Sequence, residues 1–522
     1  MNIIKKINSF AFWLKLELWK DSRLSLLLAA IHCIAFDFAC YYIYSGNNAG
    51  FAIKTTIICI GITWPFFYLL SWANKFSTLF FSFIFLIDGL AAYFIWNYKL
   101  ELRADTLALM YESNLQEARA FIGVPLLAWI LISIGTAFLI TRKRSKNNLA
   151  ASDRWKVFLI LLLIGILSYR IFKHIDYRMP KPLPASLLQE SQRYFKEKSR
   201  LKKMLASKVD ISESVTRKPD DNMTIILVIG ESARSDHFSL NGYNRETNPE
   251  LKKRNVVSYT DVKSCGNQTR ISVPCMLTRN TVANHRNLLK ETSLISLFRA
   301  AGFATAWYSN QRVMHENDTV TTSIASEAQE LYFTKLSYNN ARDEYLLPKI
   351  NEFIASRTES KMLVVHTIGS HWSYDHRYDA AHEIFKPACH DSTQWTCADQ
   401  SLINAYDNSI IYTDWFLASI IDSLKSSNAM LMYISDHGES LGEDGFFSHG
   451  QDDYRKEEHS VPLIIWASEK YRSIHPDRYS AAQQKLNQDL SHDFIFHSLL
   501  DCSGIETTVI NKNLSLCRTV DK

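Results

Sequence analysis

Apolar residues are distributed differently in the two halves of the chain. Before about residue 173 they gather into five nearly continuous stretches, at about residues 24–45, 51–72, 76–97, 121–141 and 156–172. Each stretch is close to the roughly 20 residues that a helix needs to cross a bilayer. From residue 223 onward, short apolar runs alternate with helical patterns. We therefore predict a membrane domain with five transmembrane helices (1–173), a linker (174–222) and a soluble domain (223–522).

Basic residues are concentrated on one side of the predicted spans. They precede the first span and follow the fourth, at Lys5, Lys6, Lys15, Lys20, Arg23, Arg142, Lys143, Arg144 and Lys146. If the spans alternate in direction, both segments lie on the same face of the membrane, and their positive charge marks that face as cytoplasmic. Five crossings then place everything after residue 173 on the opposite side.

Polar positions also occur within the membrane half. Asp37, Asp88 and Lys54 lie in or near the spans, where a polar side chain either has a function or forms hydrogen bonds between helices. The loop at residues 99–120 has a helical pattern with several acids. It would either hold a lipid head group or support the soluble domain, and the sequence leaves both open.

The linker combines a stiff break with a basic helix. Pro180, Pro182 and Pro184 predict the break. Residues 187–208 have an amphipathic, basic pattern, which predicts a helix that lies on anionic lipid or, alternatively, a solvated spacer. Residues 209–222 are polar and show no periodicity, so we predict a loop there.

Short apolar runs in the second half predict β-strands at residues 224–229, 305–309, 362–366, 430–435 and 462–467. The first run is β-branched with almost no polar residue, which is typical of a strand that is buried on both faces. Because helical patterns separate the runs, we predict a layered α/β domain with a mostly parallel sheet.

Acidic residues and a histidine directly follow two of these strands. Glu231 comes after the run at 224–229, and Asp436 and His437 come after the run at 430–435. In open α/β sheets, ligands bind at the carboxyl ends of the strands. Two carboxylates and an imidazole are suitable ligands for catalytic zinc or a similar divalent ion. The sequence therefore predicts a metal site at this edge.

Three further residues carry reactive groups in loops after strands. Thr269 lies in the segment CGNQT, and His371 and His449 follow later strands. A threonine hydroxyl becomes a useful nucleophile when a divalent ion contacts its oxygen, although a loop threonine is more often a turn or capping residue. The histidines would bind a phosphate or protonate a leaving group. A histidine considered alone is more often structural.

The nine cysteines form two groups. Three lie in apolar stretches, and six form close pairs in the second half: Cys265 and Cys275, Cys389 and Cys397, Cys502 and Cys517. None of these pairs has the CxxC spacing of a zinc ribbon, so disulfides in an oxidising compartment are favoured over reduced thiols. The predicted topology agrees, because it exports this half. The net charge of +5 is small for 522 residues and the second half has no basic stripe, so we expect no nucleic-acid partner.

A set of short motifs resembles a known enzyme family. The motifs are GESAR (230–234), NGYNR (241–245), TNP (247–249), CGNQT followed by SVPC (265–275), GSH (369–371) and SDHGESLGEDG (435–445). Together with five spans, they are similar to the phosphoethanolamine transferases of Gram-negative inner membranes. That family modifies lipid A, core sugars or periplasmic glucans, and includes transferable polymyxin-resistance enzymes. The resemblance implies a multi-pass inner-membrane protein whose periplasmic catalytic domain is similar to alkaline phosphatases and arylsulfatases.

The resemblance also implies roles for single residues. One or two zinc ions would be bound, the first by Glu231, Thr269, Asp436 and His437. Thr269 would be the nucleophile that carries a covalent phosphoethanolamine group. Contacts to the substrate or to a second metal would come from His371, His449, Glu439, Asn114, Glu117 and Arg312.

The chain departs from the family's lipid A members at a few positions. Those members carry an additional disulfide and a lysine where this chain has residues 309–312, and Arg312 is the one residue that would replace the lysine. Leu109 stands where the family usually has an asparagine. These positions concern substrate contacts, so they leave the acceptor open.

We therefore expect zinc-dependent transfer of phosphoethanolamine from phosphatidylethanolamine to lipid A or the lipopolysaccharide core, or else to a periplasmic glucan. The partners would be these lipids and glycans, and we expect a monomer. One alternative is a membrane-tethered phosphodiesterase or sulfatase-type hydrolase with the same metal site. Another is a catalytically inactive sensor or scaffold, although a complete set of metal-binding residues argues against it.

Overall fold

The computed structural model describes most of the chain. The described residues are 22–73, 76–98, 102–112, 123–142, 150–175, 180–217, 222–284, 291–311, 319–334, 336, 340–356, 359–390, 394–450, 454–486 and 488–518. The chain divides into two compact units, Met1–Lys196 and Glu197–Lys522. The predicted domain boundaries at 173 and 222 stay predictions.

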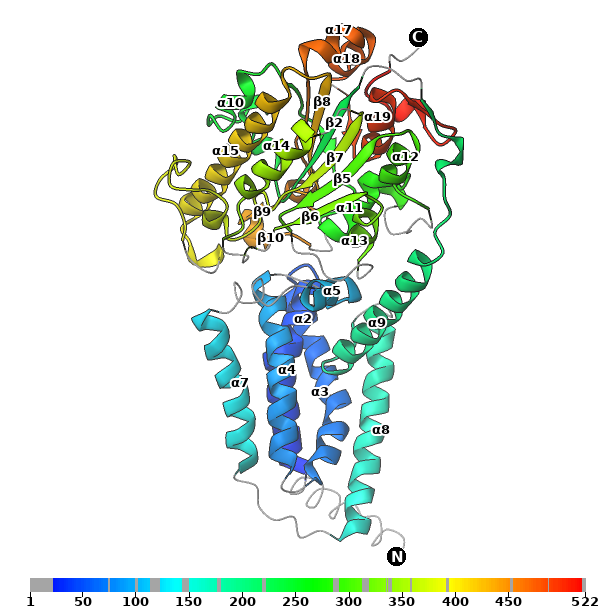
Figure 1. The fold of residues 1–522 in the computed structure, drawn as a ribbon. Coiled ribbons are helices and arrows are strands. Elements are labelled where there is room, and N and C mark those ends of the chain that lie inside the picture. Colours follow the sequence, from blue (N-terminus) through cyan, green and yellow to red (C-terminus); the bar gives the residue numbers. More distant parts are fainter. Residues whose placement is uncertain are drawn as a thin grey trace, which may run out of the picture. The chain divides into compact units, whose positions relative to one another are not determined.

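The described part of the first unit contains five helices that are long and apolar enough to cross a membrane (Figure 1). They are Ser22–Tyr44, which ends in α2 (Phe38–Tyr44), α3 (Ala49–Ser71), α4 (Ser77–Tyr98), α7 (Val124–Arg142) and α8 (Ala151–Ile175). Each lies on one of the apolar stretches of the sequence, as predicted. Large apolar side chains such as Leu131 and Ile57 are exposed on them, as lipid-facing positions would be.

Small residues bring these helices close together. A Cβ atom added at Gly165 of α8 would lie 2.9 Å from Pro65 Cγ of α3, and one added at Gly89 of α4 would lie 2.7 Å from Ser133 Oγ of α7. The Trp129 indole N–H of α7 also donates to the Gly89 carbonyl oxygen, at 2.8 Å. In a membrane, where lipid competes for apolar contacts, such close backbone approach stabilises helix pairs.

A buried polar cluster connects the first span with α4. His32 Nε2 and Asp88 Oδ2 lie 2.8 Å apart in a hydrogen bond, and both side chains are fully buried. The first span widens into a π-helical turn at Cys33–Asp37, and Asp37 Oδ1 accepts a hydrogen bond of 2.8 Å from the backbone N–H of Leu183. Hydrogen bonds between segments thus engage both aspartates of the predicted spans.

The loop after α4 and the linker both contain a helix. They are α5 (Ala104–Glu112) and α9 (Ala185–Leu205). Tyr111 of α5 stacks on Tyr194 of α9 with ring centroids 5.1 Å apart, and its hydroxyl lies 3.1 Å from Ser191 Oγ. Helix α5 therefore packs against the first part of the linker helix.

The second unit is built around a seven-stranded sheet in the order β3-β11-β8-β2-β7-β5-β6. The strands are β2 (Thr224–Gly230), β3 (Val257–Tyr259), β5 (Ala304–Ser309), β6 (Glu330–Phe333), β7 (Lys361–His366), β8 (Ala429–Ser435) and β11 (Leu463–Ala467). Five neighbouring strands are parallel, and β11 runs antiparallel to β8 and β3. The sheet is mostly parallel, as predicted.

Helices cover both faces of this sheet (Figure 1). Ile225, Leu227 and Ile229 of β2 belong to a core that also includes residues of α11 (Thr269–Leu277), α12 (Leu294–Ala300) and α19 (Asp493–Cys502). Ile226 and Val228 face the opposite core, with residues of α14 (Leu347–Ser356) and α15 (Asp399–Leu424). Because β2 is buried on both faces, every one of its side chains is apolar or small.

Shorter elements complete the unit. The helices are α10 (Pro249–Lys252), α13 (Val320–Ala325), α16 (Lys456–His459), α17 (Glu469–Ile474) and α18 (Pro476–Gln484). Two-stranded pairs join β4 (Val262–Lys263) with β12 (Leu490–Ser491), and β9 (Ser440–Leu441) with β10 (Phe447–Ser448). A third pair corrects the loop predicted at 209–222, because β1 (Thr216–Arg217) pairs with β13 (Ile505–Glu506). Its partner lies almost at the other end of the chain, so no local pattern marks it.

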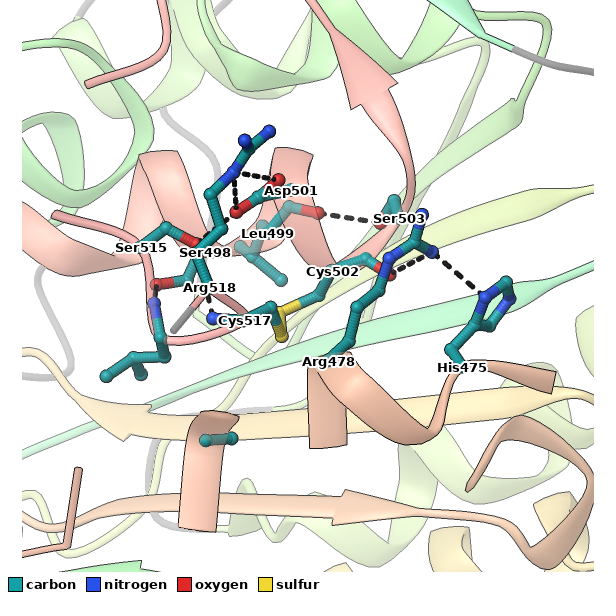
Figure 2. The surroundings of a disulfide bond; sticks show 12 residues. His475, Arg478, Ser498, Leu499, Asp501, Cys502, Ser503, Ser515, Cys517 and Arg518 are labelled. Carbon is teal, nitrogen blue, oxygen red and sulfur yellow. Dashed lines mark hydrogen bonds and ion pairs between the residues drawn. A yellow bond between two sulfur atoms is a disulfide. The ribbon is translucent and has the colours of Figure 1, made fainter. Parts of the chain in front are cut away.

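The structure contains the three predicted disulfides, Cys265–Cys275, Cys389–Cys397 and Cys502–Cys517. Figure 2 shows the last of these, which ties the end of α19 to the C-terminal segment. Polar contacts surround it: Arg478 Nη1 donates to the Cys502 carbonyl oxygen (3.3 Å), and Arg518 Nε donates to Asp501 (2.7 Å). The C-terminal segment is thus held against the core by one covalent bond and several hydrogen bonds.

We expect Asp88→Ala to destabilise the first unit, because it leaves the buried His32 imidazole without this partner. The expected loss is roughly 2 kcal/mol, the cost of an unsatisfied buried polar group. The thermal unfolding midpoint of the purified protein in detergent micelles would measure it. His32→Ala should have a similar effect, and the double variant should be less destabilised than the sum of both. Additive effects would contradict a direct interaction.

Candidate active site

The register between β2 and β8 brings two carboxylates together. The two strands are parallel neighbours with Gly230 opposite Ser435. Glu231 directly follows β2, and Asp436 directly follows β8. The Asp436 backbone N–H donates to the Gly230 carbonyl oxygen at 3.0 Å. Both side chains therefore emerge at one point of the sheet edge, where the sequence predicted a metal site.

His437 and Thr269 join these carboxylates. His437 Nε2 lies 3.3 Å from Glu231 Oε1 and 3.5 Å from Asp436 Oδ2. The Thr269 hydroxyl donates to Glu231 Oε2 at 3.0 Å, and its oxygen lies 3.5 Å from His437 Nε2. We call these four residues the primary cluster. Thr269 is the first residue of α11, so the partial positive charge of the helix N-terminus adjoins its hydroxyl.

The primary cluster fits a divalent metal ion. Glu231, Asp436 and His437 each offer a ligand atom within 4.8 Å of the others. Asp436 Oδ2 is buried without a hydrogen-bond partner. His437 Nδ1 hydrogen-bonds the Gly438 carbonyl oxygen at 2.8 Å, which orients the ring so that Nε2 faces the carboxylates. A backbone carbonyl that holds the second nitrogen in this way is a common feature of metal-binding histidines.

Charges within the cluster shift the pKa of each group. Burial lowers the pKa of His437, but Asp436 and Glu231 outweigh burial and raise it to about 10. Burial, together with the charge of Glu231, raises the pKa of Asp436 to about 7. Burial acts in the same direction on Glu231, yet His437 holds the pKa of that carboxyl well below its usual range. The surroundings of His437 Nε2 therefore favour a positive charge.

A second group of residues borders the primary cluster. His449 stacks edge-on against His437 with ring centroids 4.0 Å apart, and its Nδ1 lies 3.6 Å from Glu439 Oε2. The His371 ring lies 5.9 Å from the His449 ring. Burial raises the pKa of Glu439 to about 8 and lowers that of His449. We call His371, His449 and Glu439 the outer group. Two overlapping sets from both groups offer further metal-ligand atoms.

The structure brings seven of the predicted site residues into these two groups. Asn114, Glu117 and Arg312 lie outside the described residues. Two of the motifs hold loops in place. In GESAR, the Arg234 guanidinium donates to Glu443 Oε1 at 2.5 Å. In NGYNR, Tyr243 and Arg245 donate to the buried carboxylate of Asp407, at 2.9 and 2.7 Å.

Sequence analysis missed three residues that support the site. Gln311 Nε2 donates to Glu231 Oε2 at 2.7 Å, and its position two residues after β5 is the signal that would have identified it. Asp343 accepts from the backbone N–H groups of Ile368 (2.9 Å) and Gly369 (3.0 Å), just before His371. His492 joins the Cys265 N–H to the Ser435 carbonyl oxygen, at 3.1 and 3.0 Å. No local pattern marks the last two residues.

Comparisons with known proteins identify the family of the chain. The Sulfatase family model matches residues 223–505. Phosphoethanolamine transferase EptA of Escherichia coli strain K12 is 30% identical over 489 residues, which cover 84% of this chain and 85% of that protein. The chain belongs to the phosphoethanolamine transferase family. Phosphatidylethanolamine transferase Mcr-2 of Escherichia coli is 29% identical over 483 residues, covering 85% of this chain and 88% of the relative.

Solved structures of similar proteins extend the family assignment to the fold. The integral membrane protein lipooligosaccharide phosphoethanolamine transferase A (EptA) from Neisseria meningitidis has a TM-score of 0.81 at 21% identity, covering 96% of this chain and 99% of that chain. The C-terminal periplasmic domain of EptC from Escherichia coli, solved in complex with Zn, has a TM-score of 0.54 at 25% identity and covers 60% of this chain and 90% of that chain. This phosphoethanolamine transferase therefore shares the fold of an integral membrane enzyme.

Asp436→Asn is expected to lower the zinc content of the purified protein severalfold, because an amide is a much weaker zinc ligand than a carboxylate. Elemental analysis of the full chain would measure the zinc per protein. Asp414→Asn is the matched control: Asp414 is also fully buried, but it accepts backbone hydrogen bonds from Glu250 and Leu251 of α10. An equal zinc content in both variants would argue against the primary cluster as the zinc site.

Zinc affinity of the primary cluster should rise with pH. A metal ion displaces the proton of His437, whose pKa is about 10, so we expect the affinity to rise about tenfold per pH unit between pH 7 and 9. At pH values below the Asp436 pKa of about 7, zinc affinity should change more steeply with pH, because the metal ion must also displace a proton from Asp436. Competition with a chelator of known affinity would measure it, and a flat profile would contradict the proton displacement.

Proposed function

We propose that this enzyme transfers phosphoethanolamine from phosphatidylethanolamine to an envelope glycolipid, through a covalent intermediate on Thr269. The observation that carries this proposal is the position of the Thr269 hydroxyl, 3.0 Å from Glu231 Oε2 and 3.5 Å from His437 Nε2. A hydroxyl among metal-binding groups is what a covalent mechanism requires, because threonine alone is a weak nucleophile. Membership of the transferase family supports the same reaction.

Zinc is the metal that best suits the primary cluster, since one imidazole and two carboxylates form a typical catalytic zinc set. Held by Glu231, Asp436, His437 and the Thr269 oxygen, it would lower the pKa of the hydroxyl and offset phosphate charge. The outer group would contact the phosphate or a second zinc ion. The N-terminus of α11 adds partial positive charge where the phosphate must lie.

The reaction has two displacements at phosphorus. In the first, the Thr269 oxygen forms a bond to phosphorus while the bond to the diacylglycerol oxygen breaks. The threonine proton passes to Glu231 Oε2, which it faces, and a histidine of the outer group gives a proton to the departing oxygen. In the second displacement, an acceptor hydroxyl gives its proton to that histidine while its oxygen attacks the same phosphorus, and the Thr269 oxygen leaves and takes its proton back from Glu231.

The membrane unit is consistent with a lipid donor. A site that draws phosphatidylethanolamine from the bilayer must stay near its surface, whereas an enzyme for soluble substrates needs no such anchor. We therefore propose an inner-membrane location with the catalytic unit in the periplasm, where the three disulfides are stable. Lipid A or the lipopolysaccharide core is the proposed acceptor, with a periplasmic glucan as the alternative. The predicted substrate contacts remain Asn114, Glu117 and Arg312. The predicted oligomeric state remains a monomer.

Intact mass spectrometry of the purified protein after incubation with phosphatidylethanolamine tests the mechanism. We expect the wild type to gain the mass of one phosphoethanolamine group, mapped by fragmentation to Thr269. Thr269→Ala should gain nothing, because it lacks the oxygen that forms the bond. Zinc content and unfolding temperature of both proteins provide the control for folding.

Other outcomes would support the rival functions. Release of free ethanolamine phosphate by a zinc-loaded protein that forms no adduct would indicate a hydrolase. A protein with neither adduct, product nor zinc would indicate a sensor or scaffold. Adduct on Thr269→Ala would exclude Thr269 as the nucleophile.

A further inference from the structure

Glu458 is a buried carboxylate beside the active site that has no part in the mechanism described above. It lies in the short helix α16 (Lys456–His459), and its side chain is fully buried. Its two oxygens accept three hydrogen bonds. Burying a carboxylate is costly unless its hydrogen-bonding capacity is used, so the identity of these donors indicates what the residue does.

The three donors come from three segments that each adjoin a residue of the site. Oε1 accepts from Ser440 Oγ at 2.7 Å, next to Glu439 of the outer group. Oε2 accepts from Asn267 Nδ2 at 2.7 Å, two residues before Thr269, and from the Gly450 backbone N–H at 3.2 Å, next to His449. One side chain thus bridges the loop of the nucleophile, the loop of His449 and the loop that follows the metal ligands.

The backbone around Glu458 is itself fixed to the metal-ligand loop. The Glu458 carbonyl oxygen accepts from the Gly438 N–H at 2.8 Å, and the Glu457 carbonyl oxygen accepts from the Glu439 N–H at 3.2 Å. A Cβ atom at position 438 would lie only 2.0 Å from the Glu457 carbonyl oxygen, which accounts for Gly438. The His459 carbonyl oxygen also accepts from the Ser264 N–H at 2.8 Å, at the start of the nucleophile loop.

We propose that Glu458 is a positioning residue that holds Thr269 and His449 in place relative to the metal-ligand loop. The inference rests on the transfer reaction proposed above. Thr269 is the first residue of α11 and His449 follows the two-residue strand β10, so neither belongs to the central sheet, and apolar packing alone does not set their distance from His437. A misplacement of a reacting group by about 1 Å can cost about 100-fold in rate. Hydrogen bonds from a single buried carboxylate provide the missing constraint.

The chemistry of the donors predicts which substitutions are tolerated. All three donors are uncharged, so the negative charge of Glu458 is not required to hold them. Glutamine has the same shape: its oxygen can accept from Asn267 and Gly450, while its amide group donates to the Ser440 hydroxyl, which also accepts hydrogen bonds. Leucine has a similar volume but leaves all three donors without this acceptor.

The test measures the rate at which the phosphoethanolamine adduct forms on Thr269 in the full-length, zinc-loaded protein with saturating phosphatidylethanolamine vesicles. For Glu458→Leu we expect the rate to fall about 10- to 100-fold, as for a misplaced nucleophile. Glu458→Gln should stay within about threefold of the wild type, because its hydrogen bonds remain. Zinc content should be unchanged in both, since Glu231, Asp436 and His437 keep their positions.

A matched control separates positioning from stability. Glu327 is a largely buried carboxylate that accepts from Ser293 Oγ (2.7 Å) and Ser296 Oγ (2.8 Å) at the start of α12. Glu327→Leu removes these bonds, the bond from the Ser293 N–H (2.8 Å) and the ion pair with Lys208 Nζ (2.6 Å), so it should lower the unfolding temperature at least as much and leave the adduct rate unchanged. Asn267→Ala provides a second variant that removes the bond between Glu458 and the nucleophile loop and should also slow adduct formation.

The possible outcomes are distinct. If the wild type forms no adduct, the proposed function fails and this inference fails with it. If the wild type forms the adduct and Glu458→Leu and Asn267→Ala do so at the wild-type rate, only the positioning role is overturned. It is also overturned if Glu458→Leu loses its zinc, or if Glu458→Gln is as slow as Glu458→Leu, because the residue would then act through the metal or through its charge.

Discussion

The parallel register of β2 and β8 is the constraint on which the active site depends. Both strands are buried on both faces, so a slip of one residue would turn every side chain toward the opposite core. This register makes Glu231 and Asp436 neighbours and directs them, with His437, to one point of the sheet edge. The positions of the predicted metal-binding residues are therefore set by the core rather than by their own loops.

Buried polar groups fix the loops of the site by hydrogen bonds. Asp343 holds the loop before His371, His492 links the nucleophile loop to β8, and Glu458 links that loop to Gly450. Each of these side chains accepts hydrogen bonds from a backbone or side-chain donor of a catalytic loop. Because loops bury little apolar surface, hydrogen bonds to a fixed, buried partner are the strongest way to define their conformation. The cost of burying carboxylates is offset by the donors that surround them.

The two units are stabilised by different interactions. In the catalytic unit, apolar burial on both sides of the sheet drives assembly. In the membrane unit, lipid is as apolar as the helices, so close contacts at Gly89 and Gly165 and the His32–Asp88 hydrogen bond hold the helices together. The proposed lipid donor would require both, since the reaction would take place in a polar site that must remain at a membrane.

Local sequence patterns were sufficient wherever a structural feature depends on burial or length. Five long apolar stretches predicted the membrane helices, and the β-branched run at 224–229 predicted β2. The places of Glu231, Asp436 and His437 just after strands predicted that these side chains meet at one edge of the sheet. The close cysteine pairs predicted the disulfides. Local patterns did not predict which elements and residues contact each other, because these contacts join residues far apart in the chain. Examples are the antiparallel placement of β11, the pairing of β1 with β13, and the contacts of Asp343, His492 and Glu458. The periodicity of apolar residues indicates which side of a helix or strand is buried. The packing of the whole domain determines which other elements lie next to it.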